Sequence, residues 1–207
     1  MQAFFSTMFT LLILAAGESS RMGSPKALLQ IGSETFVECI TRKGRESGAS
    51  GALVVTGASH RELITRMPAS VVVVHNTNYQ NGQFSSLQEG IRYLPQSCSL
   101  ALVWPVDLPL VETESITALL DNYQKNSNPL TIPVYGGRKG HPVLYNREAL
   151  DIALTLAASQ TARELRECFL NRIGFVNVED CGVTIDIDTL EDYRRYIISD
   201  LRFQISD

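Results

Sequence analysis

Two basic side chains, Arg21 and Lys26, lie in a short loop that follows an apolar run ending in Ala15, Ala16 and Gly17. Small residues at the end of such a run let a ligand approach the main chain closely, and exposed backbone N–H groups can bind phosphate oxygens. The residue types therefore predict a loop that binds a nucleoside triphosphate. An ordinary turn with two solvated charges is the simpler interpretation of the same pattern.

Two well-known phosphate-binding motifs are excluded. A Walker loop has four residues between its glycines and ends in Gly-Lys-Ser/Thr, whereas five residues separate Gly17 from Gly23 and Lys26 precedes Ala27. The dinucleotide fingerprint G-x-G-x-x-G is also absent. A phosphate loop here must therefore be of a third kind.

A first candidate metal ligand is Asp107, which follows the apolar run 100–104 and lies between Pro105 and Pro109. The two prolines stiffen the turn and fix the direction of the carboxylate. Magnesium prefers oxygen ligands and is usually held by one or two carboxylates together with substrate phosphates. Asp107 is therefore a candidate Mg²⁺ ligand, and a cap of the following turn is an equally weighted alternative.

A second acidic segment contains Asp186 and Asp188, separated by the apolar Ile187. In an extended segment alternate side chains point to the same side, so the two carboxylates are expected to be near neighbours. Asp188 could instead cap the last helix. The pattern leaves open which of the two carboxylates contacts a metal ion.

His141 lies between Gly140 and Pro142 at the entry to an apolar run. A histidine in this position can act in catalysis, but it is more often structural or in contact with substrate. No nucleophile motif G-x-S-x-G occurs in the chain.

Alternating apolar and amphipathic segments must position these residues. They predict an α/β fold, a three-layer α/β/α sandwich with a mainly parallel sheet. Thr35 and Glu38 form a capping-box pattern at the start of one helix, and Ser85 or Ser86 could cap another. The expected strands are 11–14, 51–56, 71–74, 100–104, 130–134, 142–145 and 173–178, with a short extended piece at 183–187. The expected helices are 35–48, 58–66, 85–94, 112–125, 147–156, 161–170 and 190–198.

In folds of this kind ligands bind beyond the carboxyl ends of the strands. That rule predicts that four loops converge on one site. They are the loops 15–26, 76–86, 105–109 and 140–142, which are rich in polar residues, glycine and proline.

The chain has 207 residues, 18 Lys and Arg, 22 Asp and Glu, and a net charge of -4. This length predicts a single domain over 1–207 with its core at about 10–198. The charge argues against nucleic acid or a membrane as partner.

The apolar N-terminus lacks the basic start of a signal peptide, so we expect a cytoplasmic protein. If Met8 is the natural start, residues 1–7 are a flexible extension. Four widely spaced cysteines predict reduced, mostly buried thiols.

Leu14–Lys26 reads LAAGESSRMGSPK. It resembles the L-A-A-G-x-S-x-R-M-G-x-P-K signature of MobA-like nucleotidyltransferases with a glycosyltransferase-A-like fold, and it fits every fixed position. Further similar segments are 78–87, 105–110, 140–144 and 186–192, so the resemblance covers nearly the whole chain. Within that superfamily the chain is most similar to the molybdenum cofactor cytidylyltransferases.

The resemblance implies a Mg²⁺-dependent enzyme in which an acceptor phosphate attacks the α-phosphorus of a nucleoside triphosphate and releases pyrophosphate. CTP and a molybdopterin-type acceptor are the expected substrates, and a molybdoenzyme or its maturation factor is an expected protein partner. Catalytic roles fall on Lys26, Arg21 and Asp107, and metal binding on Asp107 and Asp188. The implied nucleotide-binding residues are Leu14, Ala15, Ala16, Gly17, Arg21, Lys26, Asn78, Gly82 and Ser85, with His141 and Asp186 on the acceptor side.

Three features depart from the family pattern. Phe84 stands where a Ser is common, Leu108 stands where a Gln is common, and 157–163 lacks the usual Gly-Asp-x-Gly before Ala-Arg. These departures concern the acceptor more than the reaction. Ala16, where guanylyltransferases tend to carry Gly, favours CTP over GTP. The alternatives are a sugar-phosphate or polyol-phosphate nucleotidyltransferase, and a module that binds nucleotide or cofactor without turnover.

Overall fold

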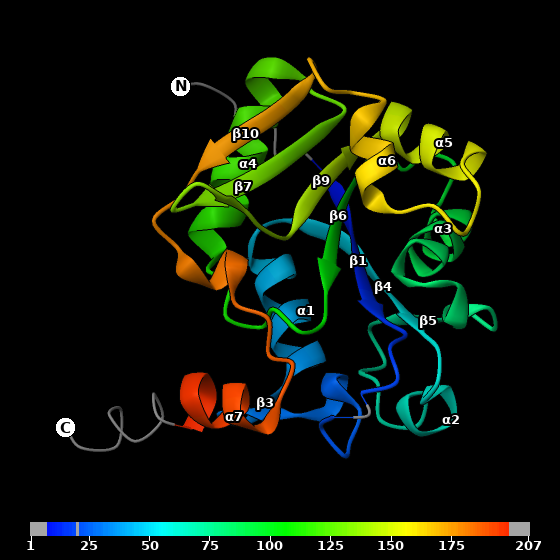
Figure 1. Cartoon of the computed structure of the whole chain (residues 1–207), viewed down its shortest axis with the longest axis vertical. Coiled ribbons are helices and arrows are strands. Elements are labelled where there is room, and N and C mark those ends of the chain that lie inside the picture. Colours follow the sequence, from blue (N-terminus) through cyan, green and yellow to red (C-terminus); the bar gives the residue numbers. More distant parts are fainter. Residues whose placement is uncertain (1–7, 20, 199–207) are drawn as a thin grey trace.

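A computed structural model describes residues 8–19 and 21–198 of the chain. The extension expected at 1–7 lies outside the described residues. The fold is built on one mixed, mainly parallel sheet whose strand order is β10-β7-β9-β6-β1-β4-β5, with β8 paired to β7 (Figure 1). Its strands are β1 (Phe9–Ala15), β4 (Ala49–Thr56), β5 (Val72–His75), β6 (Leu100–Pro105), β7 (Leu130–Tyr135), β8 (Arg138–Lys139), β9 (Val143–Asn146) and β10 (Ile173–Asn177).

The central strands β1, β4, β5 and β6 are parallel, as are β7 and β10, whereas β9 runs antiparallel to both β6 and β7. Helices cover both faces of this sheet (Figure 1). The predicted α/β class and mainly parallel sheet are therefore confirmed. The α-helices are α1 (Phe36–Glu46), α2 (His60–Leu63), α3 (Gln83–Tyr93), α4 (Thr113–Asn126), α5 (Arg147–Thr155), α6 (Ala162–Glu167) and α7 (Leu190–Tyr193).

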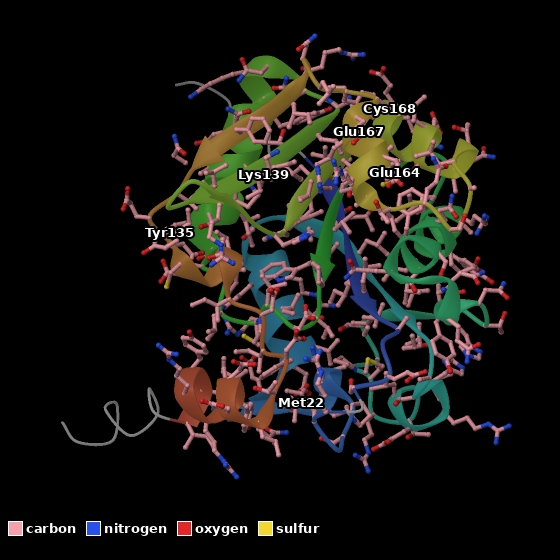
Figure 2. The ribbon with its side chains drawn as sticks, in the orientation of Figure 1. Met22, Tyr135, Lys139, Glu164, Glu167 and Cys168 are labelled. Atoms are coloured by element: carbon pink, nitrogen blue, oxygen red, sulfur yellow. The ribbon has the colours of Figure 1, made fainter. Side chains whose placement is uncertain are left out.

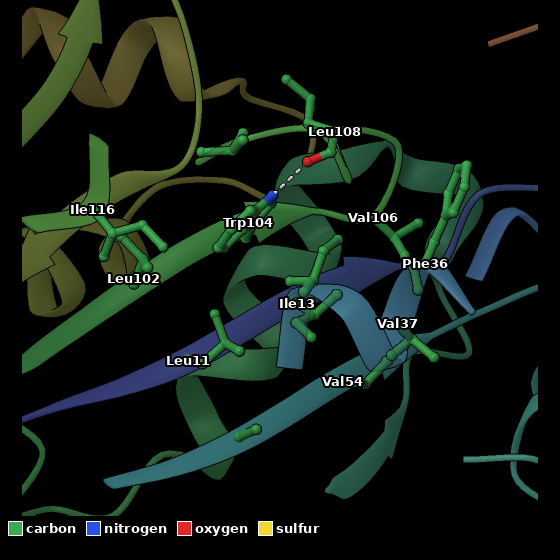
Figure 3. Packing of buried hydrophobic residues seen from close by; sticks show 14 of the residues in the cluster. Leu11, Ile13, Phe36, Val37, Val54, Leu102, Trp104, Val106, Leu108 and Ile116 are labelled. Atoms are coloured by element: carbon green, nitrogen blue, oxygen red, sulfur yellow. Dashed lines mark hydrogen bonds between the residues drawn. The ribbon is translucent and has the colours of Figure 1, made fainter. Parts of the chain in front are cut away.

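Alternation along β1 explains how the sheet buries both faces. Leu11 and Ile13 belong to the core beneath α1 and α4, whereas Leu12 and Leu14 belong to the core beneath α3 and α5. Figure 3 shows the first of these cores, in which the Trp104 indole N–H donates to the carbonyl of Leu108 at 2.9 Å. Leu108 thus keeps the turn after β6 packed into the core.

The starts of the helices were predicted with mixed success. The Thr35 capping box of α1 is present, with Glu38 bonded back to the Thr35 backbone. Helix α3, however, begins at Gln83 after Gly82, so neither Ser85 nor Ser86 is its N-cap. Gly82 adopts a φ of 98°, which glycine reaches without steric cost.

Other local predictions need correction. The helix expected at 58–66 shrinks to α2, and the extended piece expected at 183–187 begins as the 3₁₀ turn Cys181–Thr184. Thr189, rather than Asp188, caps α7 through a capping box with Asp192. The last predicted helix continues beyond α7 as a π-helical segment, Arg194–Ile198.

All four cysteines are free, but only Cys39 and Cys98 are buried, while Cys168 and Cys181 are exposed. The expectation of mostly buried thiols is therefore only half right. Within residues 8–19 and 21–198, no helix has the length and apolar content needed to cross a membrane.

Candidate active site

The carboxyl ends of β1 and β6 meet at one edge of the sheet, where both arrowheads point the same way (Figure 1). A cavity of about 430 Å³ opens there, within the range typical of small-molecule sites. Three of the four predicted loops contribute to it, together with the acidic segment near the C-terminus. Among its lining residues are Leu14, Ala15, Ala16, Gly17, Arg21, Lys26, Gly82, Asp107 and Asp188, all of them predicted site residues.

Lys26 forms the centre of the charged part of this cavity. It starts a 3₁₀ turn, Lys26–Leu28, and its side chain is only 13% exposed. The ammonium lies 3.2 Å from Asp107 Oδ2 and also donates to Asp188 Oδ1. One cation therefore bridges two carboxylates that are 81 residues apart in the sequence.

Backbone hydrogen bonds explain why the two acidic segments meet. The Ile187 N–H donates to the Asp107 carbonyl at 2.8 Å, which pins the 186–188 segment against the turn after β6. The Val106 N–H in turn donates to the Leu14 carbonyl at 3.0 Å, which ties that turn to the end of β1. The apolar Ile187 is fully buried, and Asp188, which follows it, lines the cavity.

Asp107 does not cap the following turn. Its Oδ2 accepts from Lys26, and its buried Oδ1 has no hydrogen-bond partner among the described residues. An unpaired buried carboxylate oxygen is costly unless a ligand satisfies it. Together with Asp188 it offers the oxygen donors that Mg²⁺ prefers, so these residues fit a divalent cation.

The described residues contain no cluster of three or more His, Cys, Asp or Glu side chains that could hold a metal ion. That finding is compatible with a magnesium site, because one or two carboxylates and the phosphates of a substrate are enough to bind this ion. A metal at Asp107 and Asp188 would therefore depend on the nucleotide for its remaining ligands.

The two aspartates of the acidic segment have opposite electrostatic environments. The hydrogen bond from Lys26 is the main cause that lowers the pKa of Asp188, and Arg21, 3.5 Å from its Oδ2, adds to the effect. Burial is the main cause that raises the pKa of Asp186, followed by the charges of Asp107 and Asp188. Asp186 does not line the cavity. Asp188 is thus the carboxylate that faces the cations.

The loop after β1 leaves its backbone accessible. A Cβ placed on Gly17 would meet no other atom within 4 Å, so the space beside this backbone opens into the cavity. The Ser19 hydroxyl accepts from the Lys26 N–H at 3.1 Å and closes the loop on itself. This geometry leaves room for an anionic ligand against the main chain.

The loop after β5 is organised by Asn76, which sequence reasoning missed. Its side-chain amide donates to the hydroxyls of Ser85 and Ser86 at 3.0 Å each, and its Oδ1 accepts from the Asn78 N–H at 2.9 Å. A polar residue that closely follows an apolar run is the same signal that identified Asp107, and it could have identified Asn76. Ser86 lines the cavity, whereas the predicted Asn78 and Ser85 hold the loop together behind it.

Several other lining residues were not predicted. They come from α2, α3 and the segments that precede these helices: Ser59, Leu63, Tyr79, Gln80 and Gln83. Gly57 permits the close approach of Tyr79, because a Cβ there would lie 2.3 Å from the Ala16 carbonyl and 2.7 Å from Tyr79.

His141 does not line the main cavity. Its backbone N–H donates to the Val183 carbonyl at 2.8 Å, and the residue lines a second, smaller cavity. Burial lowers the pKa of His141, while the charge of Asp107 opposes that shift. The fourth predicted loop therefore lies beside the site without forming its wall.

Comparisons with known proteins identify the family of the chain. The MobA-like NTP transferase domain matches residues 11–173, which include the glycine loop, Lys26 and Asp107. The probable molybdenum cofactor guanylyltransferase of Bacillus mycoides (strain KBAB4) is 28% identical over 192 residues, covering 88% of this chain and 92% of the relative.

Among solved structures, Rv0371c from Mycobacterium tuberculosis H37Rv is similar with a TM-score of 0.78 and 23% identity, over 93% of this chain and 99% of its own. A complex of Rv0371c with manganese has a TM-score of 0.74 and 22% identity, over 92% and 98%. At these identities the likeness establishes the fold. Because the family match spans most of the chain, this protein is a nucleotidyltransferase of the MobA-like NTP transferase family.

Proposed function

We propose that the chain transfers a nucleoside monophosphate from a nucleoside triphosphate to a phosphate-bearing acceptor of the molybdopterin type and releases pyrophosphate. The observation that carries the proposal is the bridging of Asp107 and Asp188 by Lys26 at the mouth of the cavity. A cation beside two carboxylates and an open backbone loop is the set of groups that a metal-bound triphosphate needs.

In this proposal each group acts by position and charge. The backbone of 15–17 and Arg21 hold the triphosphate, and Lys26 moves from the carboxylates to the oxygens of the α-phosphoryl group. There its charge stabilises the negative charge that develops as the acceptor phosphate attacks. The second pKa of a phosphate monoester is about 6, so the nucleophile is already ionised near neutral pH and needs no strong general base.

Asp107 and Asp188 would hold Mg²⁺, which supplies charge neutralisation to the phosphates when bound. The unpaired Oδ1 of Asp107 supports this assignment. The manganese in the Rv0371c complex supports a divalent cation in a protein of the same fold. Asp186, whose pKa is raised by burial, is assigned to the acceptor side together with His141.

The nucleotide is proposed to be CTP, with GTP as the second candidate. Ala16 in place of a second glycine supports CTP, whereas the printed names of the relatives support GTP. Gly82 lines the cavity, and Asn78 and Ser85 fix the shape of the same loop, so we assign these residues to the base and ribose pocket. A cytoplasmic molybdoenzyme or its maturation factor is the protein partner consistent with this product.

The test is pyrophosphate release with CTP, GTP, ATP and UTP in the presence of Mg²⁺ and three acceptors: molybdopterin, a hexose 1-phosphate and a polyol phosphate. We expect release with CTP and molybdopterin at least tenfold faster than with any other pair. Preference for GTP would reassign the base, and preference for a sugar or polyol phosphate would reassign the acceptor. Binding of nucleotide without release from any pair would instead identify a non-catalytic binding module.

A further inference from the structure

A second cavity of about 70 Å³ lies between the β7–β9 part of the sheet and helix α6. It is several times smaller than the main cavity of about 430 Å³, so it suits a small group rather than a whole nucleotide. Four polar side chains line it: Lys139, His141, Tyr145 and Arg166. The remaining lining residues are apolar or glycine, and none carries a carboxylate.

The two cations at this cavity are not paired with carboxylates among the described residues. Among the described residues, Arg166 and Lys139 make no ion pair with a carboxylate, although Lys139 lies 5.0 Å from the centre of the Phe175 ring. By contrast, Arg163 pairs with Glu167 and Arg172 pairs with Glu148. Two uncompensated cations at one small cavity favour an anionic occupant.

The buried groups point to the same kind of occupant. The Nδ1 atom of His141 is buried and has no hydrogen-bond partner. Burial raises the pKa of the Tyr145 phenol to about 12, so its hydroxyl keeps its proton and can donate near neutral pH. Guanidinium, ammonium and phenol groups all donate hydrogen bonds, and a neutral imidazole can donate through one nitrogen. The lining is therefore complementary to the oxygens of an oxyanion.

This cavity is distinct from the triphosphate loop. Figure 2 shows Lys139 and the α6 residues Glu164 and Glu167 in the upper half of the view, whereas Met22, which lies in that loop, is near the bottom. His141 connects the two regions, since it lines the small cavity and its ring feels the charge of Asp107.

We propose that this cavity is an oxyanion subsite for the acceptor, in which Lys139, His141, Tyr145 and Arg166 hold one phosphate-type group. The identity of the acceptor in this proposal rests on the proposed function. The binding of an oxyanion in this cavity is independent of that function. Arg166 and Lys139 neutralise the anion, and Tyr145 and His141 orient it through hydrogen bonds. The subsite would select acceptors that carry such a group.

The test is a ³¹P NMR titration of inorganic phosphate into the full chain without nucleotide. Because phosphate could also bind at the triphosphate loop, the titration is repeated in a Lys26→Met background. We expect phosphate binding to persist in the Lys26→Met protein. Adding Arg166→Gln to that protein should weaken phosphate binding at least tenfold, and adding Arg166→Lys instead should weaken it less. Lys139→Gln, on an exposed hairpin, is the second variant and should also weaken binding. Arg147→Gln, which removes an exposed cation paired with Asp151, is the matched control and should change affinity less than twofold.

Phosphate binding that is lost in Lys26→Met and unaffected by Arg166→Gln would overturn the subsite. With an active enzyme, Arg166→Gln should raise the KM for the acceptor at least tenfold and leave the KM for the nucleotide within twofold. An inactive parent protein that still binds phosphate through Arg166 would refute the proposed function and leave the subsite standing.

Discussion

At the scale of single residues, Lys26 links the two halves of the site. Its ammonium contacts Asp107 and Asp188, and its backbone N–H closes the glycine loop through Ser19. The loop residues and Asp107 could be predicted from sequence, because small residues and a carboxylate directly follow buried strands. Their contact through Lys26 could not, because it joins segments that are far apart in the chain.

Lys26→Met is expected to lower kcat by 10²- to 10³-fold, the effect of removing one charge-stabilising donor from an active site. Met preserves the length of the side chain, so the loss reports on the charge. Lys125→Met, on the exposed end of α4, is the control and should leave turnover unchanged. Unchanged turnover in Lys26→Met would contradict the catalytic assignment.

The same substitution should change how stability depends on pH. Lys26 lowers the pKa of Asp188 below its ordinary 3.8, so the ion pair stabilises the fold above that pH and loses its effect as acid protonates Asp188. Asp188 is 41% exposed, so solvent screening limits the contribution to about 1 kcal/mol or less. Thermal melts should therefore show a lower Tm for Lys26→Met at pH 7 and a smaller difference at pH 3. A difference that grows toward acid pH would refute this account.

At the scale of elements, α3 is the helix that carries the nucleotide-side loop onto the sheet. Gly90 allows this contact, because a Cβ there would lie 2.5 Å from Leu12 Cδ1 and 2.9 Å from Val55 Cγ2. The helix was predicted, but its start at Gln83 was not. The two serines, Ser85 and Ser86, were the expected caps, whereas the helix follows Gly82, which ends the preceding turn with a positive φ. Those serines instead accept hydrogen bonds from Asn76.

Gly90→Val is expected to destabilise the protein by about 1–3 kcal/mol, because extra methyl groups must displace Leu12 and Val55 in a close-packed core. A chain of this size should then lose roughly 2–10 °C in Tm, measured by differential scanning calorimetry. Gly51→Val is the matched control, since a Cβ at Gly51 meets nothing within 4 Å and valine favours a strand. A Tm for Gly90→Val equal to that of the parent would show that α3 can shift without cost.

At the scale of the whole molecule, the alternation of strands and helices was enough to predict the α/β class and the edge of the sheet where the candidate site lies. The antiparallel strand β9 was not predicted, because its apolar residues resemble those of the parallel strands. Its direction is set by its short connection to the β7–β8 hairpin. That reversal places His141 at the entry to β9, beside the small cavity and away from the main one.

Nucleotidyl transfer moves the α-phosphoryl group of the nucleotide to the acceptor. The most direct measurement follows the fate of CTP labelled with ³²P at either the α or the γ position, incubated anaerobically with Mg²⁺ and molybdopterin. We predict that the α label appears in an acceptor-linked product and the γ label in pyrophosphate, in equal amounts. Recovery of the γ label as orthophosphate, or of the α label as free CMP, would contradict nucleotidyl transfer.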